Sequence, residues 1–416
     1  MSRIEDDPRY HPYFLKGNPF PSMAIIDPLN PDIRYNGTIF NKEVFEEEVA
    51  NLKKKIEAKV NLIYVTGGGW ERGVGKSALI VQEWRRLKSQ SDATSVYIKV
   101  EPKSTPDDLC DDVVLKWHAD GFLWETLKKV LLKYGEEAPS PKVMSSDVRA
   151  FLSTFPEITD EISFGLFSFL YKPAVVVSDM TQWICRISSI AKDDVVRVFL
   201  NAYLTKPSSF RDEWLKIRHS KGLDKIDCFR TLMELMRIAG YKYHYFFFDQ
   251  FEEAVEPLRG ASLSLFSTRM SSLLKACIGQ ATIIVTLHPS AELTLSQPEG
   301  MHVRSLAGLD HRHKVDVSTM SPDEGVKLCL SYISPFRIGK PDSPLYPFEE
   351  DAVRYLTFLT NGIPRFALED FNRAVEVGIS SDYAKITLDF VKEHHEDITG
   401  KVFIAEKLQE FMQYAK

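Results

Sequence analysis

A glycine-rich loop between two regular segments constrains this chain more than any other feature. The apolar run Asn61–Thr66 predicts a buried strand, and the loop after it holds three consecutive glycines and ends in Gly75-Lys76-Ser77. Apolar residues then recur at helical spacing, which predicts a helix that begins near Gly75. A strand that enters a tight turn and continues as a helix is typical of a parallel α/β sheet.

The same loop has the residues of a phosphate-binding site. Its glycines let backbone N–H groups face an anion, and the helix N-terminus adds the positive end of its dipole. Lys76 would reach the β- and γ-phosphates of a nucleotide, and the Ser77 hydroxyl would ligate Mg²⁺. The predicted loop contacts are Gly69, Gly73, Val74, Gly75, Lys76, Ser77 and Ala78.

One position in the loop departs from the usual spacing. The first glycine normally stands five residues before the last, but Trp70 occupies that place, and the use of Gly69 makes the loop one residue longer. The alternative interpretation is a glycine-rich turn with a purely structural role.

A second segment predicts carboxylates at the edge of the sheet. The apolar run before Asp249 favours a buried strand, and Gln250, Phe251, Glu252 and Glu253 follow it. Ligands of parallel sheets bind beyond the carboxyl ends of the strands. Asp249 would hold the Mg²⁺ shell directly or through water, and Glu252 or Glu253 would orient or deprotonate an attacking water. The alternative is an acidic helix N-terminus, which the helix dipole favours.

Two further features supply polar groups to the same region. The strand predicted over Thr282–Leu287 ends near Thr286 and His288, which are candidates for a contact to the γ-phosphate. In Gly362-Ile363-Pro364-Arg365, Pro364 begins a helix and Arg365 lies in its first turn, where a cation opposes the dipole. Contacts of Pro364 and Arg365 to a bound phosphate would explain this placement. A strand-end histidine without a contact and a solvated arginine are the alternatives.

The order of strands and helices predicts an α/β fold with a parallel sheet and additional helical parts. We expect an irregular N-terminal arm over 1–37, an α/β core over 38–100 and 241–318, a large helical insertion over 101–240, and a helical lid with a C-terminal tail over 319–416. Asn41 is expected to cap the first helix, and Ser321-Pro322-Asp323-Glu324 predicts another helix start.

Charge and apolar runs exclude several classes of protein. Lys and Arg number 52 against 58 Asp and Glu, so the net charge of −6 excludes a protein that is basic over its whole surface. The five cysteines contain no CxxC pair, which predicts no disulfide framework and no zinc–cysteine site. The apolar run Ile162–Val177 is interrupted by Lys172-Pro173 and is too short to span a bilayer. We expect a cytoplasmic protein with no membrane partner.

Taken in this order, the four motifs resemble the AAA+ and STAND branch of P-loop ATPases. The resemblance covers about 38–100 and 241–378: Gly75-Lys76-Ser77 matches Walker A, Asp249 Walker B, His288 sensor 1, and Gly362–Arg365 the lid motif. It implies ATP and Mg²⁺ as cofactors and an ATPase that converts ATP and water to ADP and phosphate.

Departures from the family pattern bear on its activity. Gln250 stands where AAA+ enzymes carry the catalytic glutamate, so hydrolysis would depend on Glu252 or Glu253, as in STAND proteins, or be slow. His288 stands where STAND proteins commonly carry arginine. The 101–240 segment is longer than in most AAA+ modules, and the tail is shorter than the winged helix of origin-recognition proteins.

The resemblance leaves more than one biological role open. The first is a nucleotide-controlled switch or scaffold that self-associates through the ATPase module and recruits a protein partner through 101–240. The second is a DNA-linked loader or initiator-like ATPase, which the net charge does not favour. A phosphotransferase on a small substrate is the third.

A subunit interface at the γ-phosphate is a further expectation from the resemblance. Such ATPases often take an arginine from a neighbouring subunit, and the matching loop contains Arg312, with Arg304 as the second choice. The alternative is a surface arginine in a monomeric switch.

Overall fold

The centre of the molecule is a five-stranded sheet with the order β2-β3-β4-β1-β5. The computed structural model describes residues 4, 6–67, 72–137, 173–205, 209–217, 223–300 and 313–414. All neighbouring strands run parallel, so the predicted parallel α/β sheet is confirmed. The strands are β1 (Leu62–Gly67), β2 (Ala93–Lys99), β3 (Tyr243–Asp249), β4 (Ala281–Thr286) and β5 (Lys314–Val317).

The strand order brings the predicted site motifs to one edge of the sheet. β4 lies between β1 and β3, with Val65 opposite Thr286 and Phe248 opposite Val285. On the other side of β3, Lys99 of β2 lies opposite Asp249. Because the carboxyl ends of parallel strands share an edge, the loop after β1, the carboxylate of β3 and the end of β4 become neighbours.

Both faces of the sheet are buried, as the continuous apolar runs of the strands predict. Leu62, Phe246 and Ile283 belong to one hydrophobic cluster, whereas their chain neighbours Ile63 and Phe247 belong to another. Successive side chains of a strand point to opposite faces, so β1, β2, β3 and β4 contribute to both clusters, whereas the edge strand β5 contributes only to the second. The result is a three-layer arrangement with helices on both faces of the sheet.

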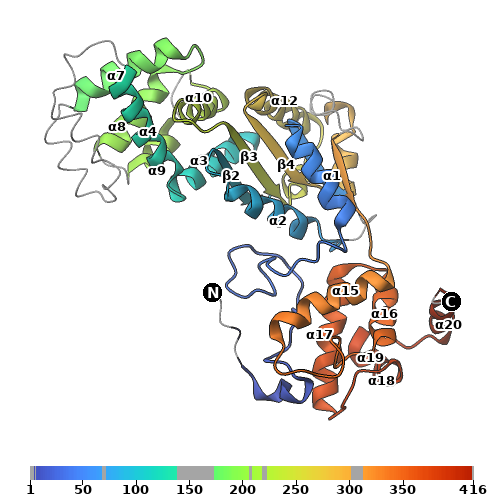
Figure 1. Cartoon of the computed structure of the whole chain (residues 1–416). Helices are drawn as coiled ribbons and strands as arrows, with labels where there is room; N and C mark the ends of the chain where they lie inside the picture. The colour runs from blue at the N-terminus through green and yellow to red at the C-terminus, as the bar shows by residue number, and fades with distance from the viewer. Residues whose placement is uncertain are drawn as a thin grey trace.

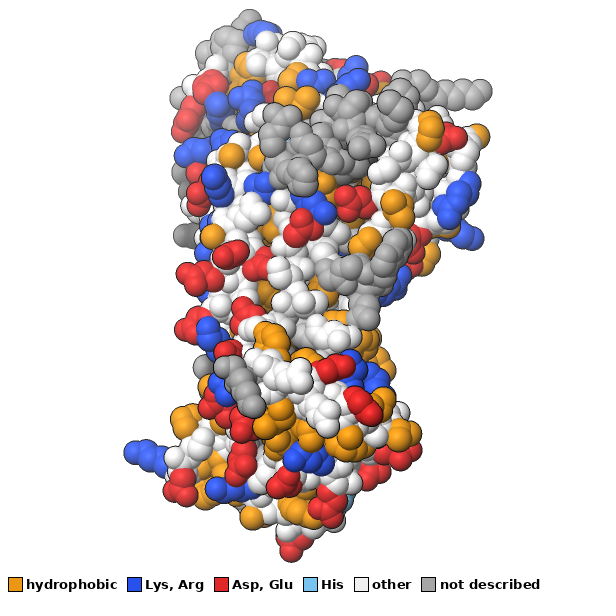
Figure 2. Space-filling view, turned by 90° about the vertical axis from the view of Figure 1, so that its right-hand side faces the viewer, with side chains coloured by type: hydrophobic (Ala, Val, Ile, Leu, Met, Phe, Trp, Pro, Cys, Tyr) orange, Lys and Arg blue, Asp and Glu red, His pale blue; other side chains and the backbone are white. Residues whose placement is uncertain are grey.

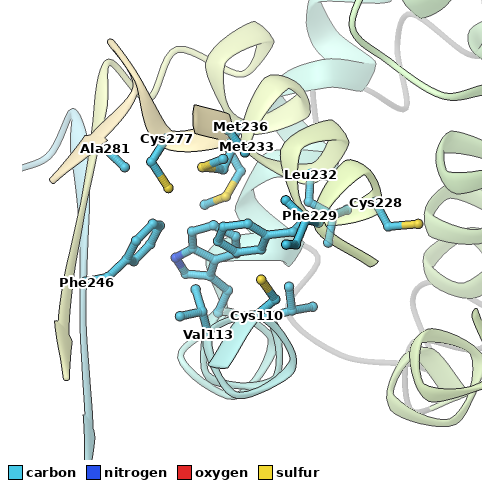
Figure 3. Packing of buried hydrophobic residues seen from close by; sticks show 14 of the residues in the cluster. Cys110, Val113, Cys228, Phe229, Leu232, Met233, Met236, Phe246, Cys277 and Ala281 are labelled. Carbon is cyan, nitrogen blue, oxygen red and sulfur yellow. The ribbon is translucent and has the colours of Figure 1, made fainter. Parts of the chain in front are cut away.

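The first face packs against α3 (Pro106–Ala119), α10 (Lys225–Ile238) and α12 (Gly260–Cys277). Figure 3 shows Phe229 of α10 and Phe246 of the sheet in the same cluster, and their ring centroids are 5.6 Å apart. The indole of Trp117 stacks on Phe229 with ring centroids 5.5 Å apart. This interlocked packing fixes α3 and α10 on the strand that ends in Asp249. The second face is covered by α1 (Glu46–Glu57) and α2 (Lys76–Lys88).

The chain between β2 and β3 is helical wherever the structure describes it. We call the described part of 101–240 the helical block, and in Figure 1 it extends to one side of the sheet. Its other helices are α4 (Phe122–Glu137), α7 (Pro173–Ile187), α8 (Asp193–Thr205) and α9 (Phe210–Ile217). The predicted helix over 146–155 and most of the apolar run Ile162–Val177 lie outside the described residues.

The chain after β5 forms helices that lie beyond the edge of the sheet (Figure 1). They are α15 (Pro322–Ile333), α16 (Glu350–Leu359), α17 (Pro364–Ser380), α18 (Leu388–Glu393), α19 (His395–Thr399) and α20 (Ala405–Tyr414). The capping box predicted at Ser321 is confirmed, because Ser321 Oγ accepts from Glu324 N and Glu324 Oε2 accepts from Ser321 N. The helix start at Pro364 is also confirmed.

The N-terminal arm packs along α17, as Figure 1 shows. Tyr10 donates to Glu376 Oε1 at 2.6 Å, and Asn18 Nδ2 donates to the same oxygen at 2.7 Å. The arm contains a short 3₁₀ helix, Pro8–Tyr13. These contacts join the first residues of the chain to its C-terminal helices.

The prediction that Asn41 caps the first helix is wrong. The helix begins at Glu46, and Asn41 Oδ1 instead accepts from Glu43 N and Val44 N in the turn before it. Asn41 Nδ2 also donates to the carbonyl of Lys327 at 3.0 Å. The side chain therefore ties the turn to α15, a long-range contact that local sequence does not reveal.

Two surface properties bear on partners. No helix among the described residues combines the length and the apolar character needed to cross a membrane. On the face in Figure 2, acidic and basic side chains of the described residues lie intermingled rather than grouped by sign. The five cysteines are free thiols, and four of them are buried.

Candidate functional site

A cavity of about 300 Å³ lies where the sheet edge, the C-terminal helices and the N-terminal arm meet. Its lining joins most of the residues predicted from sequence, although they come from separate parts of the chain. From the predicted set it contains Gly73, Val74, Gly75, Lys76, Ser77, Ala78, Asp249, Glu252, Thr286, Pro364 and Arg365.

The described part of the glycine-rich loop has a backbone that favours glycine. Gly73 and Gly75 have φ of +105° and +103°, in the left-handed region that side chains disfavour. A Cβ on Gly73 would lie 2.6 Å from the Cβ of Arg365. Gly75 is the N-cap of α2 and makes no side-chain cap, so α2 begins with backbone N–H groups available to an anion.

Asp249 is held by donors from two neighbouring strands, from α2 and from the backbone of the next residue. Its Oδ1 accepts from Ser77 Oγ at 3.0 Å, from Thr286 Oγ1 at 2.7 Å and from Gln250 N at 3.0 Å. Its Oδ2 accepts from the hydroxyl of Tyr97 on β2 at 2.6 Å. The carboxylate is therefore fixed in position beside Ser77, the side chain predicted to ligate Mg²⁺.

Lys76 and Glu252 are opposite charges buried in the same cavity. Burial lowers the pKa of Lys76, although Glu252 and Asp249 oppose that effect. Burial likewise raises the pKa of Glu252, and Lys76 acts in the other direction. Glu252 Oε2 is buried without a hydrogen-bond partner, which leaves an acceptor unsatisfied next to the glycine-rich loop.

Arg365 joins α17 to the glycine-rich loop. Its backbone N–H donates to the carbonyl of Gly73 at 3.2 Å, and its Nε donates to the carbonyl of Ala24 at 3.2 Å. The guanidinium is also close enough to Lys76 to lower the pKa of that lysine. This places a second cation beside the glycine-rich loop.

The cavity also has apolar lining residues that were not predicted from sequence. They come from the arm, from the segment before α1 and from α15 and α17, namely Ile25, Ile26, Ile39, Phe40, Leu328, Tyr332 and Leu368, and the same segments add the polar side chains of Arg34 and Asn41. The only local signal in the arm is the pair of apolar dipeptides, Ile25-Ile26 and Ile39-Phe40, within a polar stretch. Tyr97 was also missed, and its signal is a polar aromatic residue near the carboxyl end of a buried strand.

Two predicted residues lie outside the lining. Glu253 faces Arg72, with 3.7 Å between the carboxylate and the guanidinium. His288 is the N-cap of α13 (Pro289–Leu295), and its Nδ1 accepts from Ser290 N at 3.3 Å. Thr286, the other candidate at the end of β4, is the one that the structure brings to Asp249. A γ-phosphate contact of His288 stays a prediction.

Three predicted residues fall outside the part of the chain that the structure describes. They are Gly69 of the glycine-rich loop and the two candidate subunit-interface arginines, Arg304 and Arg312. Their roles stay predictions.

The described residues fit a magnesium nucleotide. The left-handed glycines and the open start of α2 form a cradle for phosphates, and Lys76 supplies the opposing charge. Ser77 would ligate Mg²⁺, and Asp249 would hold the shell through Ser77 or water. No group of three or more His, Cys, Asp or Glu in the described residues forms a separate metal site.

Comparison with known proteins gives little further support. No protein-family model matches the chain, and no curated protein matches it. Among solved structures, it is similar to the Walker-type ATPase PABY2304 of Pyrococcus abyssi, with 14% identity over 91% of this chain and 77% of that chain and a TM-score of 0.36. A likeness at that TM-score carries no argument, so the interpretation of the site rests on its own geometry.

Proposed function

We propose that this chain binds ATP with Mg²⁺ and hydrolyses it as a P-loop ATPase of the AAA+ or STAND kind. The observation that carries the proposal is the 3.0 Å hydrogen bond from Ser77 Oγ to Asp249 Oδ1. It joins the residue after the loop lysine to the carboxylate at the end of a buried strand, across 172 positions of sequence. That pairing is the arrangement that a nucleotide-bound Mg²⁺ requires.

The side chains that line the cavity favour adenine over guanine. A guanine base donates from N1 and from its amino group, and a carboxylate is the usual acceptor in proteins. The two carboxylates of the described lining, Asp249 and Glu252, lie beside Ser77 and Lys76 of the glycine-rich loop, where the phosphates are proposed to bind. The rest of the lining includes Phe40 and Tyr332, whose rings would pack against a purine.

Glu252 is the residue that we expect to activate water. Its carboxylate is buried next to Lys76, and one oxygen is unsatisfied. It would accept a proton as the water oxygen bonds to the γ-phosphorus and the bond to the bridging oxygen breaks, with the electron pair leaving on ADP. Lys76 and Arg365 would balance the negative charge on the oxygens.

The wider role that we propose is a nucleotide-controlled switch or scaffold. Arg365 and Gly73 join the C-terminal helices to the loop, so occupancy of the cavity would alter how these helices sit on the sheet. The helical block would recruit a protein partner, and the ATPase module would self-associate.

A melting experiment tests the central proposal. ATP with Mg²⁺ at about 100 times Kd should stabilise the fold by about 2.7 kcal/mol. Lys76→Ala should abolish the shift, whereas Lys88→Ala, at the far end of the same helix, should retain it. An unchanged shift in Lys76→Ala would place the nucleotide elsewhere.

A further inference from the structure

Arg72 is a cation of the glycine-rich loop with no role so far. It lines the cavity directly before Gly73, and its side chain is 55% exposed. Its guanidinium faces the short helix α11 (Glu252–Val255) and the residue after it. NH1 lies 3.7 Å from Glu253 Oε1, and NH2 lies 3.8 Å from Glu256 Oε2.

These contacts hold Arg72 only loosely. N–H···O hydrogen bonds to a carboxylate normally span about 2.7–2.9 Å, and both distances here are longer. Exposed ion pairs of this kind contribute little to stability. Little interaction free energy is therefore lost when Arg72 leaves these carboxylates and binds an anion that accepts shorter hydrogen bonds.

The phosphates of the proposed nucleotide would bind within reach of Arg72. The phosphate cradle begins at the next residue, Gly73, and both residues line the same cavity. The charge of Arg72 already acts on the buried pair at the cradle, because it contributes to the pKa values of Lys76 and Glu252. A planar guanidinium can also bind two oxygens of a terminal phosphate at once.

We propose that Arg72 is a γ-phosphate sensor within the same subunit. It pairs with Glu253 and Glu256 when the cavity is empty or holds ADP, and it moves to the γ-phosphate when ATP is bound. This inference rests on the proposed ATP site. It assigns to the chain's own loop a cation of the kind that many ATPases take from a partner.

The exchange would be transmitted to the segment after β4. Glu256 accepts a hydrogen bond from Ser290 Oγ, and that hydroxyl lies 2.6 Å from His288 Nδ1. Departure of Arg72 leaves the charge of Glu256 without its cation, next to the start of α13. The nucleotide state is thereby coupled to α13, and Glu253 is released at the same time.

Binding of two nucleotides to three variants tests this inference. We would measure the affinity of the full chain for Mg-ADP and for Mg²⁺ with a non-hydrolysable ATP analogue, together with single-turnover hydrolysis of ATP. The variants are Arg72→Ala, Arg72→Lys and the control Arg197→Ala, a surface arginine paired with Asp193 on α8.

The wild type should prefer the triphosphate analogue over ADP. Arg72→Ala should lower the affinity for the analogue about tenfold or more and change the affinity for ADP by less than about threefold. The same variant should hydrolyse ATP about a hundredfold more slowly, or slower still. The analogue affinity and hydrolysis rate of Arg72→Lys should lie between those of the wild type and Arg72→Ala, since lysine keeps the charge but not the planar guanidinium. Arg197→Ala should match the wild type.

Three results would overturn the inference and leave the ATP site intact. The first is an equal loss of ADP and analogue affinity in Arg72→Ala, which indicates general charge attraction. The second is an unchanged analogue affinity in that variant. The third is a wild type with no preference between the nucleotides. If the wild type binds neither nucleotide, the proposed function fails as well. Melting without nucleotide confirms that each variant is folded.

Discussion

Glu252 combines burial with an unsatisfied oxygen, and this combination makes a sharp prediction. Glu252→Gln keeps the shape of the side chain but removes the acceptor for a proton. We expect nucleotide affinity to stay within about threefold and hydrolysis to fall about 10²–10⁴-fold, the range typical of a general base. Isothermal titration and a phosphate-release assay measure the two quantities separately.

Glu253→Gln is the matched control for that experiment. Glu253 lies outside the cavity lining and faces Arg72 instead, so its loss should affect hydrolysis less than the loss of Glu252. Full turnover in a variant that lacks both carboxylates would contradict the assignment, and it would direct attention to Gln250 or to a base supplied by a partner.

At the residue scale, sequence predicts the parts of the site that carry local patterns. The loop lysine and Ser77 are recognisable because they follow a glycine-rich loop at the start of a helix, and Asp249 because it ends an apolar strand. Tyr97 is not, because its bond to Asp249 depends on which strand lies beside β3. The burial of Glu252 also depends on packing, so sequence could not choose between Glu252 and Glu253.

At the scale of elements, a buried histidine joins β3 to β2 and α3. His244 Nδ1 lies 2.9 Å from Thr94 Oγ1, and Trp117 Nε1 donates to the same hydroxyl at 3.1 Å. Burial lowers the pKa of His244 from 6.5 to about 4. The folded protein therefore keeps this ring neutral under conditions where the unfolded chain protonates it.

The sign of the resulting pH dependence follows from proton linkage. Between pH 6.5 and about 4, the unfolded state binds a proton that the folded state does not, so stability falls as pH decreases. We expect the titration of His244 in the unfolded chain to lower the free energy of unfolding by about 2 kcal/mol between pH 7.5 and pH 5.

The free energy of unfolding of His244→Gln should fall less over that pH range than that of the wild type, because glutamine does not titrate. The variant can still be less stable than the wild type at pH 7.5. Urea unfolding at the two pH values measures the difference. Parallel losses in the wild type and the variant would show that the histidine does not titrate as its burial implies.

The elements themselves differ in how far sequence determines them. The strands before the glycine-rich loop, before Asp249 and before His288 were predicted to within about a residue, as was the start of α15, because apolar runs and the capping box at Ser321 are local signals. The packing of the arm was not predicted, because it depends on contacts with distant segments, such as that of Asn18 with Glu376 on α17. The error at Asn41 has the same origin: its amide bonds to α15, far along the chain.

At the scale of the whole molecule, the open question is whether one chain suffices for activity. The resemblance to AAA+ proteins predicts that Arg312 acts on a neighbouring subunit, whereas Arg72 would act within its own. If Arg312 is needed, activity per chain should rise with protein concentration, and a mixture of Arg312→Ala and Lys76→Ala chains should recover activity that each lacks alone.

Size measurement alongside the rate assay decides between the two models. A rate that does not depend on concentration, with a monomer in ATP and no recovery in the mixture, would reject the subunit-interface model. It would leave Arg72 as the cation for a monomeric switch. Repeating the size measurement with DNA over a range of salt tests the loader alternative, because DNA affinity must fall steeply with salt.

The hydrogen bond between Arg365 and Ala24 has a consequence for the newly made chain. It joins residues 341 positions apart, and the cavity needs both of them as well as the loop at Gly73. A ribosome reaches the glycine-rich loop early but must translate most of the message before α17 can fold against the arm. The complete cavity therefore forms only after α17 has been made, so the proposed nucleotide would meet its full set of contacts late and would then hold α17 and the arm together.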